Sequence, residues 1–139
     1  MVGLVVATHG QLAEELIRTA EAVCGKLEQC RAVSVASTSE MDVARAQLAQ
    51  AIRDVEGGDG VLVLTDMFGG SPANLALTFL DERIEVVTGV NLPMLVKLST
   101  CRSEGATLRD TAKMLAGYGQ KNITLASELL RTRARTNRS

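Results

Sequence analysis

The sequence predicts an α/β fold in which helices cover both faces of a doubly wound, mostly parallel sheet. Two features lead to this prediction. Short apolar runs rich in β-branched residues alternate with amphipathic segments along the 139 residues, in the order β-α-β-α-β-α-β-α-α-β. The runs are also nearly continuous, which is typical of strands buried on both faces of a parallel sheet. We expect one domain over residues 1–126, followed by an arginine-rich tail over residues 127–139.

The strands are predicted where the apolar runs lie. The run after Gly60 is the clearest, because glycines precede it and two more glycines follow shortly after it. The expected strands are residues 2–7, 32–36, 60–65, 84–88 and a short last one, 123–126.

The first two helices are predicted from apolar residues at helical spacing, with charged residues between them. Gly25 is expected to end the first helix. Its apolar stripe consists of Leu12, Leu16, Ile17, Ala20 and Val23. The second helix should span residues 39–55 and turn four side chains inward, those of Val43, Leu48, Ala51 and Ile52.

Three further helices follow from capping signals. Ser71 can cap the third helix, which should run to about residue 80, and Pro72 fits its first turn. Pro93 can open a helix that ends near Cys101, and a last helix is expected over residues 108–118.

Composition argues against several classes of function. Aromatic residues make up only 2% of the chain and the net charge is −1, so neither base stacking nor a basic field supports nucleic-acid binding. Three cysteines without a CxxC pair and a single histidine argue against a metal site, and we expect no cofactor. The odd cysteine count suits a reducing compartment, and no run reaches membrane-spanning length, so we expect a cytoplasmic protein.

Arginines crowd the end of the chain. We interpret this segment as a solvated tail, and a docking role on an anionic surface is the alternative. The residues are Arg131, Arg133, Arg135 and Arg138.

The chemistry is expected where the first and third strands end. His9 follows the first strand and Asp66 follows the third. If these strands are neighbours, both side chains overhang the carboxyl edge of the sheet, where open α/β sheets bind ligands. A carboxylate that accepts a hydrogen bond from one ring nitrogen leaves the other nitrogen free to act as a nucleophile.

The residues around this pair suggest a phosphoryl group as the electrophile. Gly69 and Gly70 let backbone N–H groups approach a ligand closely, and the helix that opens at Ser71 favours an anion at its N-terminus. The hydroxyl groups of Ser71 and Thr8 could add donors. Plainer interpretations stay open: a structural histidine, an aspartate that caps a turn, and glycines that only form a turn.

Three blocks of sequence resemble the enzyme IIA domains of the mannose-type sugar phosphotransferase system. They are VVATHG (5–10), VLVLTDMFGGSPAN (61–74) and VVTGVNLPML (86–95). The resemblance implies a doubly wound α/β fold and a phosphotransferase that carries a phosphoryl group on Nε2 of His9. It also implies that Asp66 orients the ring through Nδ1 and that Ser71 and nearby amides contact the phosphoryl group.

The same resemblance implies the partners. The carrier protein HPr would donate the phosphoryl group, a IIB protein would accept it, and the membrane subunits IIC and IID would be involved only indirectly. Members of the family form dimers in which a C-terminal strand crosses to the partner sheet, and residues 123–126 would be that strand. No Ala/Pro-rich linker follows the domain, so we expect the IIB protein to be a separate polypeptide. A regulatory role is an alternative to a role in transport.

Four apolar residues are candidates for the partner surface. Met67 and Phe68 are expected to face a partner, whereas Leu92 and Met94 could equally belong to the core. Two other functions stay open at this point. One is the phosphotransferase subunit of dihydroxyacetone kinase, which is similar in fold to the mannose-type IIA domains. The other is a flavodoxin-like or receiver-like binding module, in which Asp66 itself would be the phosphate acceptor.

Overall fold

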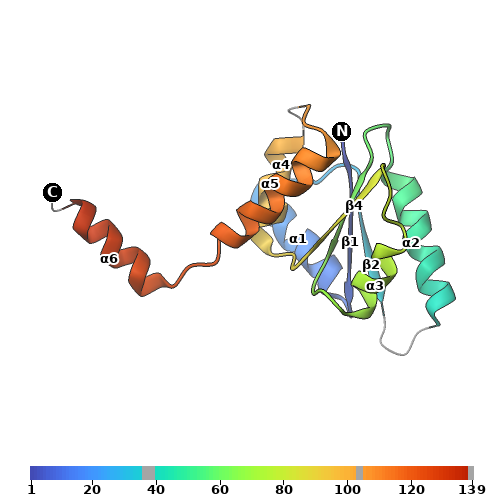
Figure 1. Ribbon diagram of the computed structural model, residues 1–139, viewed down its shortest axis with the longest axis horizontal. Helices are drawn as coiled ribbons and strands as arrows, with labels where there is room; N and C mark the ends of the chain where they lie inside the picture. The colour runs from blue at the N-terminus through green and yellow to red at the C-terminus, as the bar shows by residue number, and fades with distance from the viewer. Residues whose placement is uncertain (36–39, 103–104, 138–139) are drawn as a thin grey trace.

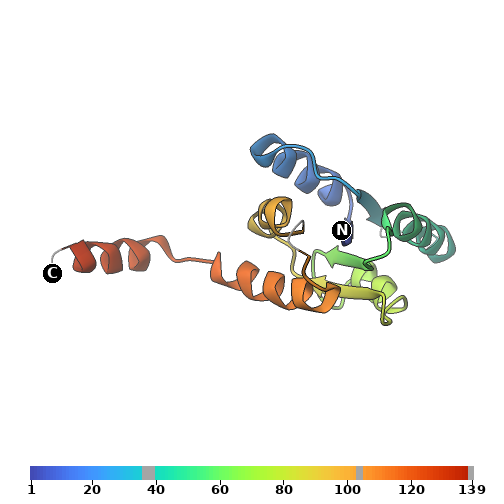
Figure 2. The same cartoon turned by 90° about the horizontal axis from the view of Figure 1, so that it is seen from above.

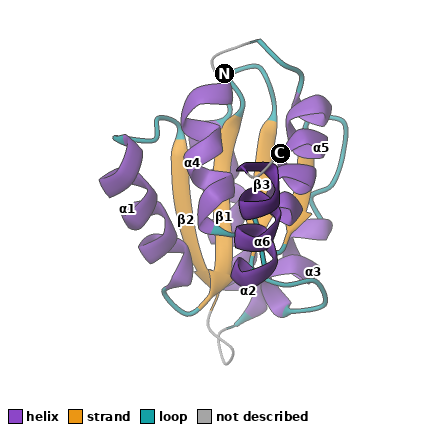
Figure 3. Ribbon diagram, turned by 90° about the vertical axis from the view of Figure 1, so that its left-hand side faces the viewer, coloured by secondary structure: helices purple, strands orange, loops and turns teal. Residues whose placement is uncertain are grey.

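The computed structural model describes residues 1–35, 40–102 and 105–137, and it confirms the predicted α/β class. Four parallel strands form one sheet in the order β2-β1-β3-β4. The elements are β1 Gly3–His9, α1 Leu12–Cys24, β2 Cys30–Val35, α2 Met41–Val55, β3 Val61–Thr65, α3 Ser71–Leu77, β4 Ile84–Thr88, α4 Leu92–Cys101, α5 Leu108–Lys121 and α6 Ala126–Asn137. Figures 1 and 3 show their arrangement.

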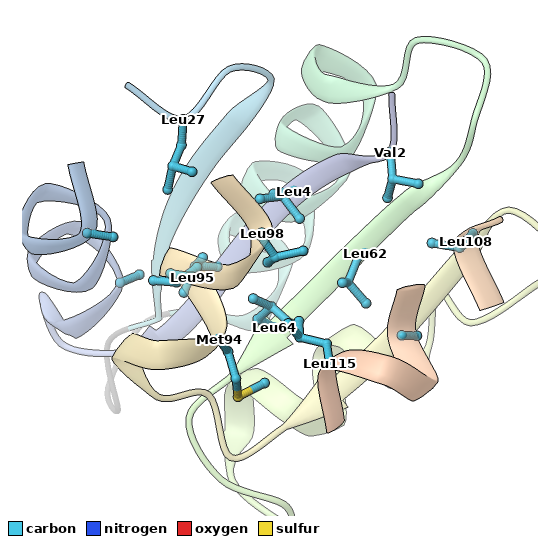
Figure 4. Packing of buried hydrophobic residues seen from close by; sticks show 14 residues of the cluster. Val2, Leu4, Leu27, Leu62, Leu64, Met94, Leu95, Leu98, Leu108 and Leu115 are labelled. Carbon is cyan, nitrogen blue, oxygen red and sulfur yellow. The ribbon is translucent and has the colours of Figure 1, made fainter. Parts of the chain in front are cut away.

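Helices cover both faces of the sheet, as the continuous apolar strands predict. One face packs against α1, α4 and α5, and the other packs against α2 and α3 (Figure 2). Because side chains alternate along a strand, Leu4 and Leu64 face the first layer of helices, whereas Val5 and Val63 face the second. Figure 4 shows the first core, where these leucines meet the side chains of α4 and α5.

The predicted helical stripes are mostly correct, but three of their residues, all near helix ends, are exposed. Leu12, Val23 and Val43 are 44%, 64% and 48% exposed, although the pattern places them inward. All three lie in the first or last turn of a helix, where neighbouring elements cover the side chains less. Ala44 is buried in place of Val43. The predicted start of the second helix at Ser39, like the end of the second strand at Ala36, lies outside the described residues.

The largest correction concerns the end of the chain. Within the single chain the predicted strand over residues 123–126 is absent: residues 123–125 have no regular structure, and α6 begins at Ala126. The tail is therefore helical as far as Asn137 rather than irregular, and Arg131, Arg133 and Arg135 lie on this helix. Arg138 lies outside the described residues. Within the part of the chain that the structure describes, no helix has both the length and the apolar character needed to cross a membrane.

Candidate functional site

The sheet brings His9 and Asp66 to the same edge. β1 and β3 are neighbours, with Ala7 paired to Thr65, so the ends of the two strands are aligned. His9 is the last residue of β1 and Asp66 follows β3 directly. The chain passes from β1 to β2 on one side and returns to β3 on the other, so the two residues lie at the switch point of the strand order.

One carboxylate oxygen of Asp66 holds both the ring and the backbone of His9. Oδ2 lies 2.8 Å from Nδ1 of the ring and accepts the backbone N–H of His9 at 3.2 Å. The second oxygen, Oδ1, accepts the backbone N–H of Met67 at 3.1 Å. The side chain of Asp66 is only 14% exposed, whereas that of His9 is 39% exposed. The carboxylate is thus fixed from three sides, and the ring it holds stays open to solvent.

This arrangement lowers the pKa of Asp66. Burial alone would raise it, but the hydrogen bonds from the ring and backbone of His9, together with the charge on that ring, bring the pKa below its usual value. Asp66 is therefore an anion at neutral pH, and an anion at Nδ1 favours the tautomer with a proton on Nδ1 and a lone pair on Nε2.

The free side of the ring faces Gly70. A Cβ at this position would lie 2.6 Å from Cε1 of His9, which is closer than real contacts allow, and 3.3 Å from Nε2, which is a tight contact. The missing side chain therefore leaves the space that the ring occupies. Among the described residues, Nε2 has no hydrogen-bond partner. The ring thus presents an exposed, unengaged nitrogen beside the start of α3.

Ser71 occupies a different helix position from the one that the sequence predicts. Gly70 is the N-cap of α3 and Ser71 is its first helical residue, so the expected side-chain cap by Ser71 is wrong. The Ser71 side chain is exposed, and its hydroxyl has no hydrogen-bond partner among the described residues. Behind it, the backbone N–H of Asn74 donates to Gly70 O at 2.9 Å, and Nδ2 of Asn74 lies 3.4 Å from Gly69 O. These contacts fix the glycine loop, a role for Asn74 that the sequence reasoning missed.

The model of the family described as "PTS system fructose IIA component" matches residues 3–116. The chain belongs to this family. The fructose-specific EIIA component of Bacillus subtilis (strain 168) is 29% identical over 94% of this chain and 90% of its own length. The mannose-specific EIIAB component of Escherichia coli (strain K12) is 28% identical over 88% of this chain, and the match spans 38% of that longer protein.

The solved structures agree with this assignment. The mannose/sorbose-specific IIA subunit of Enterococcus faecalis superimposes with a TM-score of 0.79 and 28% identity, over 89% of this chain and 93% of that one. Membership of the IIA family supports a phosphocarrier role in the sugar phosphotransferase system.

Thr8 is buried next to His9 and supports the site without being part of its exposed surface. Thr8 is fully buried, and its hydroxyl donates to the carbonyl oxygen of His9 at 3.1 Å and accepts the N–H of Ala13 at 2.7 Å. The hydroxyl therefore satisfies a free N–H in the first turn of α1, whose own N-cap residue makes no side-chain bond. The expectation that Thr8 donates to a bound phosphoryl group is wrong: its hydroxyl fixes the turn that carries His9.

The four candidates for the partner surface divide into two groups. Met67 and Phe68 are 55% and 74% exposed, directly after Asp66 in sequence. Leu92 is half-buried against the core, and Met94 is only 2% exposed. A Cβ at Gly119 would lie 2.6 Å from the sulfur of Met94, so this side chain fills the gap between α4 and α5. Met94 as a surface residue is therefore wrong, and the alternative that it belongs to the core is correct.

Replacing Gly70 by alanine tests whether the ring position matters. The backbone at Gly70 suits any residue, with φ −79° and ψ 166°, so Gly70→Ala should fold. The new methyl group should push the ring away from Asp66, and we expect the rate of phosphoryl transfer to His9 to fall by about tenfold or more. Gly117→Ala is the matched control, because nothing lies within 4 Å of a Cβ there. An unchanged transfer rate in Gly70→Ala would contradict the packing described above.

The stability contribution of Asp66 should depend on pH. Because its folded pKa is lowered, the carboxylate stabilises the fold above the usual carboxyl pKa of 3.8, and this contribution is lost as the pH falls through the folded value. Urea unfolding measures this contribution when the natural chain and Asp66→Asn are compared at about pH 7 and at about pH 2.5. We expect the natural chain to be more stable only at the higher pH. A difference in unfolding free energy that is equal at both pH values would refute this role.

Proposed function

We propose that this chain is a phosphohistidine carrier that accepts a phosphoryl group from HPr on Nε2 of His9 and passes it to a IIB protein, for sugar uptake or its regulation. The observation that supports this most strongly is the bond from Nδ1 to Asp66, which leaves Nε2 unengaged on the exposed side of the ring. A buried structural histidine would have both nitrogens engaged. The family assignment supports the same class of function.

The transfer needs no group beyond the two histidines. The lone pair on Nε2 of His9 attacks phosphorus, and the phosphorus–nitrogen bond to the donor histidine breaks, with its electron pair returning to the donor ring. The attacking ring becomes positively charged in this step. Asp66 lies 2.8 Å from Nδ1 and stabilises that charge, and it keeps the ring oriented for the onward transfer.

The phosphoryl oxygens would lie over the glycine loop. Gly69, Gly70 and Ser71 are proposed to contact them, with the exposed hydroxyl of Ser71 as one donor and backbone N–H groups as others. Because α3 has only seven residues, we assign most of the stabilisation of the phosphoryl oxygens to these short-range contacts and less of it to the helix dipole.

Protein partners would dock around the same edge. Met67 and Phe68 form an exposed apolar pair beside Asp66, which suits a transient interface with HPr and with the IIB protein. The IIC and IID subunits would be reached only through the IIB protein. A homodimer formed by strand exchange stays a prediction, and so does a cytoplasmic location. Two features are compatible with strand exchange: the outer edge of β4 is unpaired within the described residues, and Ile123 and Leu125 are exposed.

Intact mass spectrometry tests the proposal. We expect the chain, mixed with phosphoenolpyruvate, enzyme I and HPr, to gain one acid-labile phosphoryl group. His9→Ala should gain none, and Asp66→Ala should gain it slowly, because its ring is no longer held. Circular dichroism of each variant controls for folding. A folded His9→Ala chain that still gains acid-labile phosphate would exclude His9 as the carrier residue.

A further inference from the structure

The outer edge of β2 is a strand edge that lies between two helices. β2 is the last strand on its side of the sheet, and α1 and α2 pack against its opposite faces (Figures 2 and 3). A groove of about 410 Å³ follows this edge, and we call it the edge groove. Residues 31–34 of β2 line it, together with Glu14 of α1 and with Gln47, Gln50 and Asp54 of α2.

The main chain of β2 presents hydrogen-bonding groups to this groove. The N–H of Leu4 donates to the carbonyl oxygen of Gln29 at 2.9 Å, which fixes the phase of the ladder between β1 and β2. In a parallel ladder, residues 31 and 33 then direct their N–H and C=O groups toward β1, and Ala32 and Ser34 direct theirs outward. Within the described part of the chain, the outward groups of Ala32 and Ser34 have no hydrogen-bond partner.

The spacing of these groups fits an extended peptide. Ala32 and Ser34 are two residues apart, so their pairs of donor and acceptor repeat at about 6.6 Å, which is twice the rise of a strand. The main chain of an extended peptide offers donors and acceptors at the same interval, and its addition to a free strand edge satisfies both sets. A helix directs its main-chain groups along its own axis and cannot pair with them.

The charges of the edge groove favour a basic side chain in the bound peptide. Nε of Arg31 lies 4.0 Å from a carboxylate oxygen of Asp54, so these two charges offset each other. Glu14 is exposed, and none of the ion pairs between described residues includes it. Gln47 and Gln50 are uncharged, so the groove has a net charge of −1 that belongs to Glu14.

We propose that the edge groove binds an extended segment of a partner protein, which adds a strand to β2 and places a lysine or arginine beside Glu14. Its main chain would exchange hydrogen bonds with Ala32 and Ser34. A second copy of this chain is a poorer occupant, because its edge groove carries the same net charge. Its Arg31 also faces its own Asp54 and is not free to pair with Glu14.

The edge groove runs toward the phosphoryl site. Ser34 pairs with Thr8, the residue before His9, so one end of a bound segment would lie near the carboxyl edge of the sheet. The ring of His9 contacts Asp66, which follows β3 on the other side of β1. The segment would therefore hold a partner beside the site without covering the ring. The proposal does not depend on the chemistry of His9.

An NMR titration with a designed peptide tests the proposal. The probe is a capped hexapeptide in which threonine and valine alternate between a lysine at each end, so that either strand direction brings a lysine to Glu14. We expect the amide signals of Ala32 and Ser34 to shift downfield and their hydrogen exchange to slow. The same peptide with its four central amide nitrogens methylated cannot donate, and its Kd should be at least about tenfold higher.

Two variants with matched controls test the walls of the groove. Gln47→Trp fills the groove from an exposed position of α2 and should raise the Kd of the peptide at least about tenfold, whereas Ala46→Trp, on the same helix but outside the groove, should not. Glu14→Lys should raise the Kd at least about threefold, because it places like charges together. Glu128→Lys makes the same change of charge on α6 and should have no effect.

Circular dichroism checks that every variant is folded. Three results would each overturn the proposal: amide signals of Ala32 and Ser34 that do not respond, a methylated peptide that binds equally well, or a Gln47→Trp chain with an unchanged Kd. Amides of Ala32 and Ser34 that become protected in the peptide-free chain as its concentration rises would also overturn it. That result would show that a second copy occupies the edge groove.

Discussion

One oxygen atom of Asp66 links the end of β3 to His9, the last residue of β1, at the switch point of the sheet. Oδ2 of Asp66 accepts both the ring and the backbone N–H of His9, so it fixes where the ring lies and which nitrogen faces solvent. The other features of the site follow from this constraint. Gly70 must lack a side chain because the ring occupies that space, and Thr8 holds the turn behind it. The proposed chemistry needs the free nitrogen that this one carboxylate creates.

The sequence is sufficient to predict the parts of the fold that depend on local patterns. The run over residues 61–64 is apolar at every position because β3 is covered on both faces, and its residues are fully buried as expected. Gly25 ends α1 with a positive φ of 87°, as a glycine after a helical stripe indicates. The pairing of His9 with Asp66 could be predicted only conditionally, because it requires β1 and β3 to be neighbours, and strand order depends on contacts between distant segments.

The wrong predictions have a common physical origin: each depended on surroundings that a short stretch of sequence does not contain. Thr8 could have donated to a ligand, but its buried hydroxyl donates to the carbonyl oxygen of His9 instead and accepts the N–H of Ala13. Met94 lies in the third block of sequence that carries the family resemblance, yet its side chain fills the space beside Gly119. Residues 123–126 form no strand within the single chain, where no strand lies beside them and α6 begins at Ala126, and their exchange with a partner sheet stays a prediction. Hydroxyl groups and chain ends are adaptable, so neighbouring groups decide their role.

The tautomer of His9 is the most direct test of the account. The chain has one histidine, so nitrogen-15 NMR of the ring gives a single, unambiguous set of signals. At neutral pH we expect a proton on Nδ1 and a lone pair on Nε2, and we expect Asp66→Ala to lose this preference. A ring that carries its proton mainly on Nε2 in the natural chain would contradict the account, because the nitrogen assigned to attack phosphorus would then have no free electron pair.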